Sequence, residues 1–414
     1  MSNALTIENT SLPVGWVLSE LGEIADVKYG FTDKSTTEGD YRYVRITDID
    51  SNGELIGNNK KYIKYSKEAE DFLIEDNALL MARTGATFAK VLLYKDFEPS
   101  VFASYLIKIE FKEEFENALY WYFTKTKSYW EQANNLSSGA AQPHFNGKAL
   151  KQVLFPHPKS FAQQKQIVAT LDKAFAAIDT AKANAEQNLK NSKELFESYL
   201  QNVFENKGDD LVTTTIGESC NLMTGGTPSR SKKEYFENGA INWLVSGDIN
   251  KVEIRDCKGK ITELGFEESN TKLLPLNSVM IALNGQGKTR GTVAMLRIKA
   301  TCNQSLVSIY PKDDSSLLPE LIYANLEGRY NEIRKITGDS GNDRRGLNMP
   351  LIRKISFSYP TSIKKQKEII EQLKAIKSQI NNLEAIYTQK IADLEEMRKS
   401  VLQKAFSGQL NTVT

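Results

Sequence analysis

The chain has 414 residues, of which 40% are hydrophobic and 25% charged, and its formal net charge is +1. This length allows about two or three domains with cores of their own, and the composition excludes a mostly disordered chain. No apolar run approaches the roughly 18–20 residues of a membrane span, so we expect no membrane association. The near-zero net charge leaves nucleic-acid binding open, because acidic residues elsewhere can mask a basic face.

Cysteine usage points to a reducing compartment. The chain has three cysteines, Cys220, Cys257 and Cys302, and they are widely spaced. That number and spacing suit neither a disulfide framework nor a four-ligand zinc site. We therefore expect a cytoplasmic protein without a metal site.

In chain order, the first feature is a globular region over residues 12–158. Short apolar or alternating runs bounded by turns predict strands at 41–46, 78–81, 90–94 and 105–109. A helical stretch is expected near residues 116–133. This mixture predicts an α+β fold for the region.

A long helix is expected over residues 159–206. Apolar residues recur every three to four positions without Pro or Gly, which is the pattern of a coiled-coil seam. It begins after the Pro-containing segment at 155–158 and stops at a Gly-containing linker. Pattern alone leaves open that it is merely a core helix of an all-α array. The seam residues are Val168, Leu171, Phe175, Ile178, Ala185, Leu189, Phe196, Tyr199 and Val203.

The rest of the chain repeats this order. A second globular region, 211–361, has expected strands at 241–245, 278–282, 292–296 and 306–310 and a helical stretch near 319–336. A second long helix follows over 362–408. The two long helices align without gaps, with identities such as Gln164/Gln366, Leu171/Leu373 and Phe204/Phe406. Lys182 and Glu384 are polar residues at equivalent seam positions, where they could fix the register.

The two globular regions share a framework but differ in their loops. Residues 83–87 occupy the place of 284–290, and residues 137–146 the place of 338–348. A scaffold that presents different loops can carry two different specificities. A further loop, 224–230, could face phosphates or could equally be a plain turn.

These loops contain the side chains that contact DNA in other proteins. Arg and Lys suit guanine, and Asn and Gln suit adenine, whereas Ser and Thr suit phosphates. Each residue taken singly could be a solvated turn side chain, so the group carries the hypothesis. The predicted DNA-binding residues are Arg45, Arg83, Thr84, Lys90, Gln142, His144, Asn146, Thr227, Ser229, Arg230, Asn284, Gln286, Lys288, Arg290, Asn342, Arg344, Arg345 and Asn348.

Catalytic motifs are missing from the sequence. Gly285-Gln286-Gly287-Lys288-Thr289 resembles the end of a nucleotide-binding loop, but Ala282 stands where that motif needs a Gly, and a strand follows instead of a helix. The two histidines, His144 and His157, lie in or beside loops, where a solvated or DNA-facing role is expected. No Pro-Pro dipeptide is present for an adenine methyltransferase loop, so no catalytic residue is predicted.

Both halves resemble the specificity subunits of type I restriction-modification enzymes, over nearly the whole chain. The resemblance rests on Leu21-Gly22-Glu23 and Ile216-Gly217-Glu218, on the helix starts Gln164-Lys165-Gln166-Ile167 and Gln366-Lys367-Glu368-Ile369, and on the tail from Arg398 to Leu410. The segment at 155–158 departs from the family pattern only at a strand end.

The resemblance implies two pseudo-symmetric α/β target recognition domains, 12–158 and 211–361, each reading half of a bipartite, asymmetric site on double-stranded DNA. The conserved spacer helices, 159–206 and 362–408, would pack as an antiparallel coiled coil, set the spacing and dock two modification subunits. It also implies restriction subunits as partners. S-adenosylmethionine, ATP and magnesium would bind the partners, and this chain would hold no cofactor. The alternatives are a stand-alone DNA-modifying or DNA-cleaving enzyme with a duplicated body, and a coiled-coil scaffold without DNA.

Overall fold

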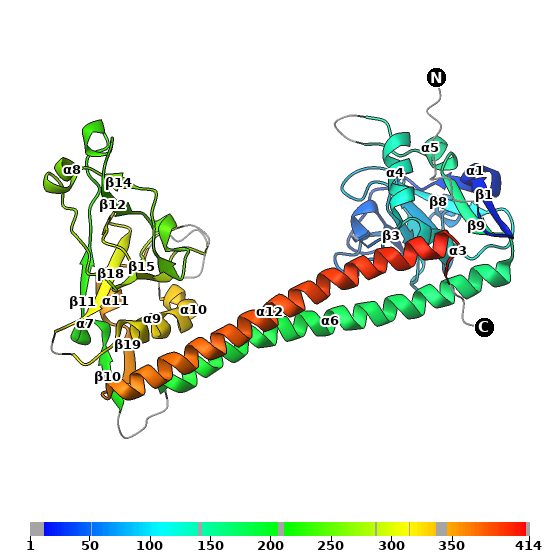
Figure 1. Ribbon diagram of the computed structural model, residues 1–414. Coiled ribbons are helices and arrows are strands. Elements are labelled where there is room, and N and C mark those ends of the chain that lie inside the picture. Colours follow the sequence, from blue (N-terminus) through cyan, green and yellow to red (C-terminus); the bar gives the residue numbers. More distant parts are fainter. Residues whose placement is uncertain are drawn as a thin grey trace. The chain divides into compact units, whose positions relative to one another are not determined.

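The computed structural model describes residues 12–50, 52–139, 143–205, 211–285, 288–313, 315–336 and 346–410. Two compact units are present: residues 1–185 with 389–414, and residues 186–388. Each unit contains one globular region and one half of each long helix (Figure 1). Within the described residues no helix has both the length and the apolar character needed to cross a membrane.

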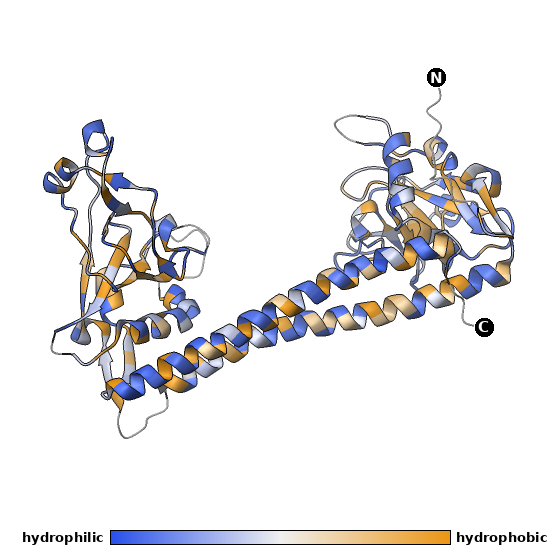
Figure 2. Ribbon diagram, viewed as in Figure 1, coloured by the Kyte–Doolittle hydropathy of each residue, from blue (hydrophilic) through white to orange (hydrophobic). Residues whose placement is uncertain are grey.

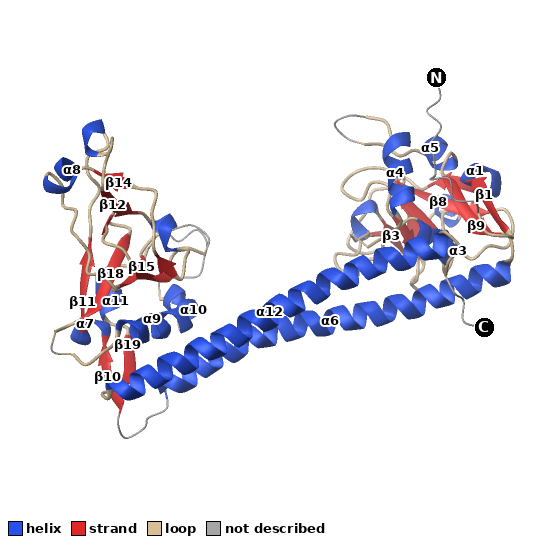
Figure 3. Ribbon diagram, viewed as in Figure 1, coloured by secondary structure: helices blue, strands red, loops and turns tan. Residues whose placement is uncertain are grey.

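The first globular region alternates short strands with short helices and 3-10 turns (Figure 3). Its strands are β1 (Trp16–Glu20), β2 (Ala25–Tyr29), β3 (Tyr41–Val44), β4 (Tyr62–Ile63), β5 (Leu79–Ala82), β6 (Val91–Leu93), β7 (Ser100–Phe102), β8 (Leu106–Phe111) and β9 (Leu154–Pro158). Its helices are α1 (Leu21–Ile24), η1 (Ile46–Asp48), α2 (Lys67–Glu70), α3 (Asn117–Phe123), α4 (Lys127–Leu136) and α5 (Gly147–Lys151).

The second globular region repeats this order of elements. Its strands are β10 (Leu211–Thr215), β11 (Cys220–Thr224), β12 (Ile241–Leu244), β13 (Glu253–Ile254), β14 (Lys260–Ile261), β15 (Val279–Ala282), β16 (Val293–Leu296), β17 (Thr301–Cys302), β18 (Leu306–Pro311) and β19 (Ser356–Pro360). Its helices are α7 (Ile216–Ser219), η2 (Lys233–Tyr235), η3 (Ser246–Ile249), α8 (Glu263–Glu267), α9 (Pro319–Gly328), α10 (Tyr330–Lys335) and α11 (Met349–Arg353).

The sheets of the two regions share their strand order, except that the main sheet of the second region has one more strand, β13, at its edge. The strand order is β2-β8-β5-β6 in the first and β11-β18-β15-β16-β13 in the second, and each has a smaller sheet, β4-β3-β7 or β14-β12-β17. A two-stranded pair closes each region, β1 with β9 and β10 with β19. The register agrees residue by residue, because Met81 lies opposite Ile107 just as Ile281 lies opposite Val307. The duplication seen in the helices therefore extends through both globular regions.

The central strands are apolar because both faces of each main sheet are covered. All four residues of β5 and all four of β15 are buried. In Figure 2 the strands near β15 and β18 are correspondingly hydrophobic. Leu79 and Met81 belong to the core that includes α3, α4 and part of the long helices, whereas Leu80 packs with the smaller sheet. Alternate residues of a strand point to opposite faces, so β5 joins two cores.

The long helices are α6 (Phe161–Glu205) and α12 (Ile363–Phe406). In the first unit they run antiparallel, since Asp179 pairs with Arg398 and Lys182 with Glu395. In the second unit the hydroxyl of Tyr199 in α6 donates to Gln372 Oε1 in α12. The predicted seam residues Leu171, Phe175, Ile178 and Ala185 are buried. In the apolar pattern of α12, by contrast, Leu383 is 38% exposed. The antiparallel helix pair and the α+β regions confirm the predicted fold class.

Each globular region has two consecutive helices where the sequence predicted one helical stretch. In the first, α3 ends at Phe123 and α4 begins at Lys127, because the Thr124 and Thr126 hydroxyls donate to carbonyls within α3 and Thr126 caps α4. In the second, α9 ends at Gly328, against which Leu200 of α6 packs closely. Local side-chain bonds of this kind compete with the helical ladder. The prediction of one continuous helix was wrong in both places.

The loop comparison was wrong by one residue. Arg83 N donates to the carbonyl oxygen of Tyr105 (3.1 Å), and Leu283 N donates to that of Ser305 (2.9 Å). The framework position of Arg83 is therefore held in the second region by Leu283 and not by Asn284. Loops of unequal length allow such a shift when only the sequence is compared.

Candidate nucleic-acid interface

Four loop segments meet at one edge of each globular region. In the first, the end of β2, the turn before β8, the loop after β5 and the segment before α5 are joined by backbone bonds: Gly30 to Leu106, Arg83 to Tyr105 and Phe145 to Arg83. In the second, Thr224 Oγ1 donates to Leu306 O, Leu283 N donates to Ser305 O, and Leu347 N donates to Leu283 O. The predicted DNA-binding loops are thus brought together from distant parts of the sequence.

A helix tyrosine fastens the loop after the central strand in each region. Tyr129 of α4 donates its hydroxyl to the carbonyl oxygen of Ala89 (2.6 Å), and Tyr330 of α10 donates to that of Lys288 (2.6 Å). Arg334 reinforces the second contact by donating to the Tyr330 hydroxyl (2.8 Å). These bonds fix the loop backbone while its side chains differ, which suits loops that present variable chemistry.

The candidates of the first region differ in availability. The guanidinium of Arg45 is already engaged by Asp48, with Nη2 2.7 Å from Oδ1 and Nε 3.1 Å from Oδ2. Thr84 is buried at 4% exposure, and Lys90 is half-buried. Arg83 is half-buried and His144 exposed, in segments that adjoin each other. Among these residues Arg83 and His144 are the better placed to meet a ligand.

Two predicted asparagines cap equivalent helices. Asn146 Oδ1 accepts from Ala149 N (3.0 Å) at the start of α5, and Asn348 Oδ1 accepts from Leu351 N (2.9 Å) at the start of α11. Asparagine is favoured at this position because its side chain satisfies an otherwise unpaired helix amide. Both side chains are exposed. Their structural role is helix capping, and contact with DNA stays a prediction.

In the second region Thr227 and Asn284 lie beside the matching edge, next to residues 304–305 and Leu283. Thr227 Oγ1 donates to Gln304 Oε1 (2.7 Å), and Ser229 pairs with Ser231 (2.8 Å). Asn284, Lys288 and Arg230 are exposed, and Arg290 is half-buried. Gly346 lies so close to Asn284 that an added Cβ would be 1.9 Å from its Oδ1. The remaining candidates, Gln142, Gln286, Asn342, Arg344 and Arg345, lie outside the described residues.

His157 is not a surface residue, contrary to the expectation. It sits in β9 at 7% exposure, stacked on Phe155, with Nε2 3.2 Å from Ser19 Oγ. Burial lowers the pKa of its imidazole. Because this side chain is buried, it does not face DNA, and its role is packing.

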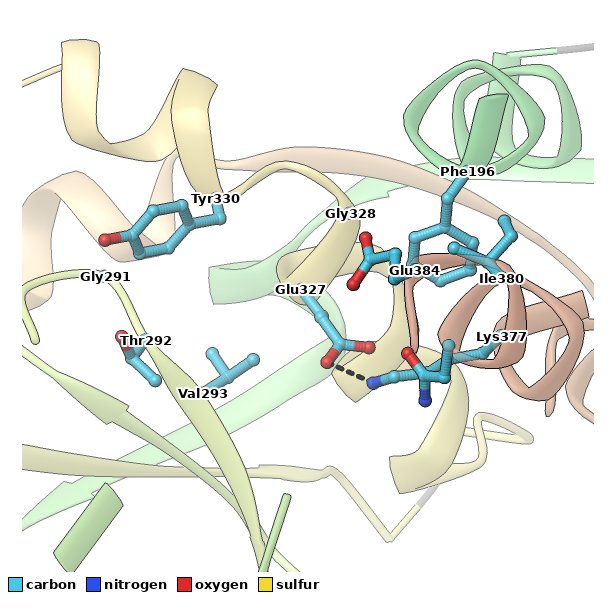
Figure 4. A pocket seen from close by; sticks show the side chains of 11 residues that line it. Phe196, Gly291, Thr292, Val293, Glu327, Gly328, Tyr330, Lys377, Ile380 and Glu384 are labelled. Carbon is cyan, nitrogen blue, oxygen red and sulfur yellow. Dashed lines mark hydrogen bonds and ion pairs between the residues drawn. The ribbon is translucent and has the colours of Figure 1, made fainter. Parts of the chain in front are cut away.

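A pocket in the second unit adjoins the loop that carries Lys288 and Arg290 (Figure 4). Lys377 of α12 pairs with Glu327 of α9 (2.5 Å), and Glu327 also accepts from the Tyr323 hydroxyl (2.6 Å). Glu384, one of the two polar seam residues, lines the pocket. The lining residues are Phe196, Gly291, Thr292, Val293, Glu327, Gly328, Tyr330, Lys377, Ile380, Asn381 and Glu384.

Two aromatic residues at this edge escaped the sequence analysis. Tyr29 ends β2 and Tyr105 precedes β8, and the guanidinium of Arg83 lies 5.4 Å from each ring centroid. They are 41% and 53% exposed. They are far from Arg83 in sequence, and only strand pairing places them beside it. Aromatic residues are common at the ends of strands, so their position in the sequence did not indicate a role at the DNA-binding edge.

Comparison with known proteins identifies the fold and the family. The model of the type I restriction modification DNA specificity domain matches residues 13–191 and 208–394. The chain therefore belongs to this family, with two copies of the domain.

Individual relatives agree with this assignment. The specificity subunit of the EcoR124I/EcoR124II type I restriction enzyme from Escherichia coli is 29% identical over 56% of this chain, and the match spans 57% of that protein. The EcoBI specificity subunit from the same organism is 20% identical over 97% of this chain and 87% of its own length. Thus the chain spans little more than half of the first relative and most of the second.

Solved structures share the fold. The HsdS subunit from Thermoanaerobacter tengcongensis has a TM-score of 0.61 at 18% identity and covers 97% of this chain and 99% of that one. A chain from a study of type I R-M complex assembly has a TM-score of 0.73 at 17% identity, covering 97% and 100%. At these identities the likeness concerns the fold alone.

Proposed function

We propose that this chain is the DNA-binding specificity subunit of a type I restriction-modification complex. Its recognition domains, 12–158 and 211–361, would each read one half of an asymmetric, two-part site on double-stranded DNA. The main support is that the two regions have the same backbone hydrogen bonds at the edge where the loops meet, whereas the side chains there differ, as at Arg83 and Leu283. A shared framework with different loop chemistry suits two different half sites.

The spacer helices, 159–206 and 362–408, would set the distance between half sites and dock two modification subunits. Restriction subunits would complete the complex. S-adenosylmethionine, ATP and magnesium would bind these partners, and the target adenine would be flipped into a partner pocket. The chain itself would carry no catalytic group and would act in the cytoplasm, where its DNA target lies.

The test is methylation by the complex in cells. The chain is co-expressed with its modification subunit, and genomic N6-methyladenine is mapped by sequencing. We expect methylation confined to one two-part motif. Methylation without sequence preference, or methylation by this chain without the partner, would refute the proposal.

The division of labour between regions is tested by exchanging one loop. Replacing residues 284–290 with the corresponding loop of a relative should alter one half of the motif and leave the other unchanged. A change in both halves would contradict the assignment of one half site to each recognition domain.

A further inference from the structure

Arg83 differs from the other arginines of the first globular region in having no acidic partner. Residues 12–158 contain three arginines. Arg42 is paired with Asp96 at 2.6 Å and Arg45 with Asp48 at 2.7 Å. Within the described part of the chain the side chain of Arg83 has no hydrogen bond or ion pair, and its contacts are the faces of Tyr29 and Tyr105. Its guanidinium donors are thus available to a ligand.

The position of Arg83 is fixed even though its donors are not used. Its backbone N donates to Tyr105 O (3.1 Å), and its carbonyl accepts from Phe145 N (2.9 Å). The hydroxyl of Tyr29 accepts from Gly147 N (2.8 Å), which ties the end of β2 to the start of α5. Because both rings belong to anchored segments, they restrict the guanidinium and reduce the entropy lost when it binds.

The second globular region keeps this backbone and replaces every side chain of the cluster. Leu283 takes the position of Arg83, with the same two bonds to Ser305 O (2.9 Å) and from Leu347 N (3.0 Å). Ser305 replaces Tyr105, and Thr224 replaces Tyr29 at the matching strand end. A cluster needed for folding would be expected in both copies. Its presence in one copy points to the half site that this copy alone reads.

We propose that Arg83, oriented by Tyr29 and Tyr105, reads a guanine in the half site of the first recognition domain. This rests on the proposed function of the chain. The planar guanidinium presents paired N–H donors that match guanine O6 and N7, the commonest specific contact in the major groove. Tyr29 and Tyr105 are positioning residues that leave the edge of the guanidinium free.

The first experiment alters the DNA and leaves the protein unchanged. The complex with modification subunits is bound to duplexes in which each guanine of its motif is replaced in turn by 7-deazaguanine, which lacks the N7 acceptor. We expect a loss of affinity at one guanine of one half site. If the replacement of each guanine leaves the affinity unchanged, the proposal for Arg83 is wrong. If the complex shows no preferred DNA sequence at all, the proposed function itself is refuted.

The second experiment assigns that guanine to Arg83. Arg83→Leu, which installs the residue of the second region, should reduce discrimination at this base pair by roughly 5- to 150-fold and leave the other half of the motif unchanged. Arg83→Lys keeps the charge but loses the paired donors, so it should also reduce discrimination at this base pair. This variant provides the test if Arg83→Leu fails to fold. Tyr105→Ser and Tyr29→Phe should have smaller effects at the same base pair.

The control variant is Arg255→Leu, which removes the same charge from an arginine that is 71% exposed and paired with Glu253. It should leave discrimination unchanged. If Arg83→Leu weakens binding equally on all sequences, Arg83 contacts a phosphate and the guanine assignment is wrong. If the sensitivity to 7-deazaguanine persists in Arg83→Lys and Arg83→Leu, another residue reads the guanine.

Discussion

The side chain of Gln164 binds the carbonyl oxygen of Pro158: its Nε2 donates across 2.9 Å from the first turn of α6 to the end of β9. Its Oε1 accepts from Glu116 N (3.0 Å), just before α3. Gln366 repeats both contacts at α12, donating to Pro360 O (2.8 Å) and accepting from Leu318 N (2.8 Å). This buried amide joins each long helix to its globular region.

Removing either amide should destabilise its unit. Gln164 is 2% exposed and Gln366 is fully buried, so Gln164→Ala or Gln366→Ala leaves a carbonyl and an amide without partners. We expect a loss of about 2–4 kcal/mol in the free energy of unfolding, measured by denaturant titration. Gln166→Ala, an exposed glutamine two residues away, is the control. Equal effects of Gln164→Ala and Gln166→Ala would show that the buried bonds contribute nothing.

The helix tyrosines should control the mobility of the recognition loops. Tyr129→Phe removes the bond to Ala89 O, and Tyr330→Phe removes the bond to Lys288 O. Each variant should lose about 1 kcal/mol and show faster amide hydrogen exchange in the adjacent loop only. Tyr65→Phe, which removes a hydroxyl that donates to Glu70 from a 56% exposed residue, should do neither. Unchanged exchange at residues 83–90 in Tyr129→Phe would contradict the anchoring role.

The ion pair between the seam residue Lys182 and Glu395 should contribute little to stability. Their charged atoms are 2.5 Å apart, with side chains 32% and 43% exposed, so solvent screens the attraction. A double-mutant cycle with alanine should give a coupling of about 0.2–1 kcal/mol that falls in high salt. The hydrogen bond from Lys182 lowers the pKa of Glu395, so the coupling should also disappear as acid protonates this carboxyl. A coupling well above 1 kcal/mol would show that the pair is shielded from solvent.

Lys125 should make stability rise with pH. Burial lowers the pKa of its ammonium to about 8, beside the ring of Trp121. The folded chain then loses a proton that the unfolded chain keeps up to about pH 10.4. Unfolding takes up a proton in this window, so raising the pH stabilises the folded state. The free energy of unfolding of the wild type should rise relative to Lys125→Met between pH 7 and 10. Lys127→Met, which replaces a lysine with a 90% exposed side chain, is the control and should show no such trend. If the free energy of unfolding of the wild type instead falls relative to Lys125→Met as the pH rises, the pKa of Lys125 is raised and the prediction is wrong.

Regular, local patterns were readable from the sequence. The long helices were predicted with their starts because an apolar seam without Pro or Gly follows Pro158 and Pro360, and Phe161 and Ile363 begin α6 and α12. Strands such as β5 and β15 were readable as short apolar runs. The breaks after Phe123 and Gly328 were not, because they depend on threonine hydroxyls and on a side chain of α6.

The duplication, the family and the loops that vary between the two halves follow from the sequence by itself, because each is a matter of residue order and spacing. The tertiary structure alone decided what those loop residues do. It paired Arg45 with Asp48, turned Asn146 and Asn348 into helix caps, and enclosed His157 within a strand. It also placed the rings of Tyr29 and Tyr105 against the guanidinium of Arg83. The contacts of Tyr29 and Tyr105 with Arg83 depend on the pairing of β2 and β5 with β8, and strand pairing is set by burial in the folded state and not by neighbours in the chain.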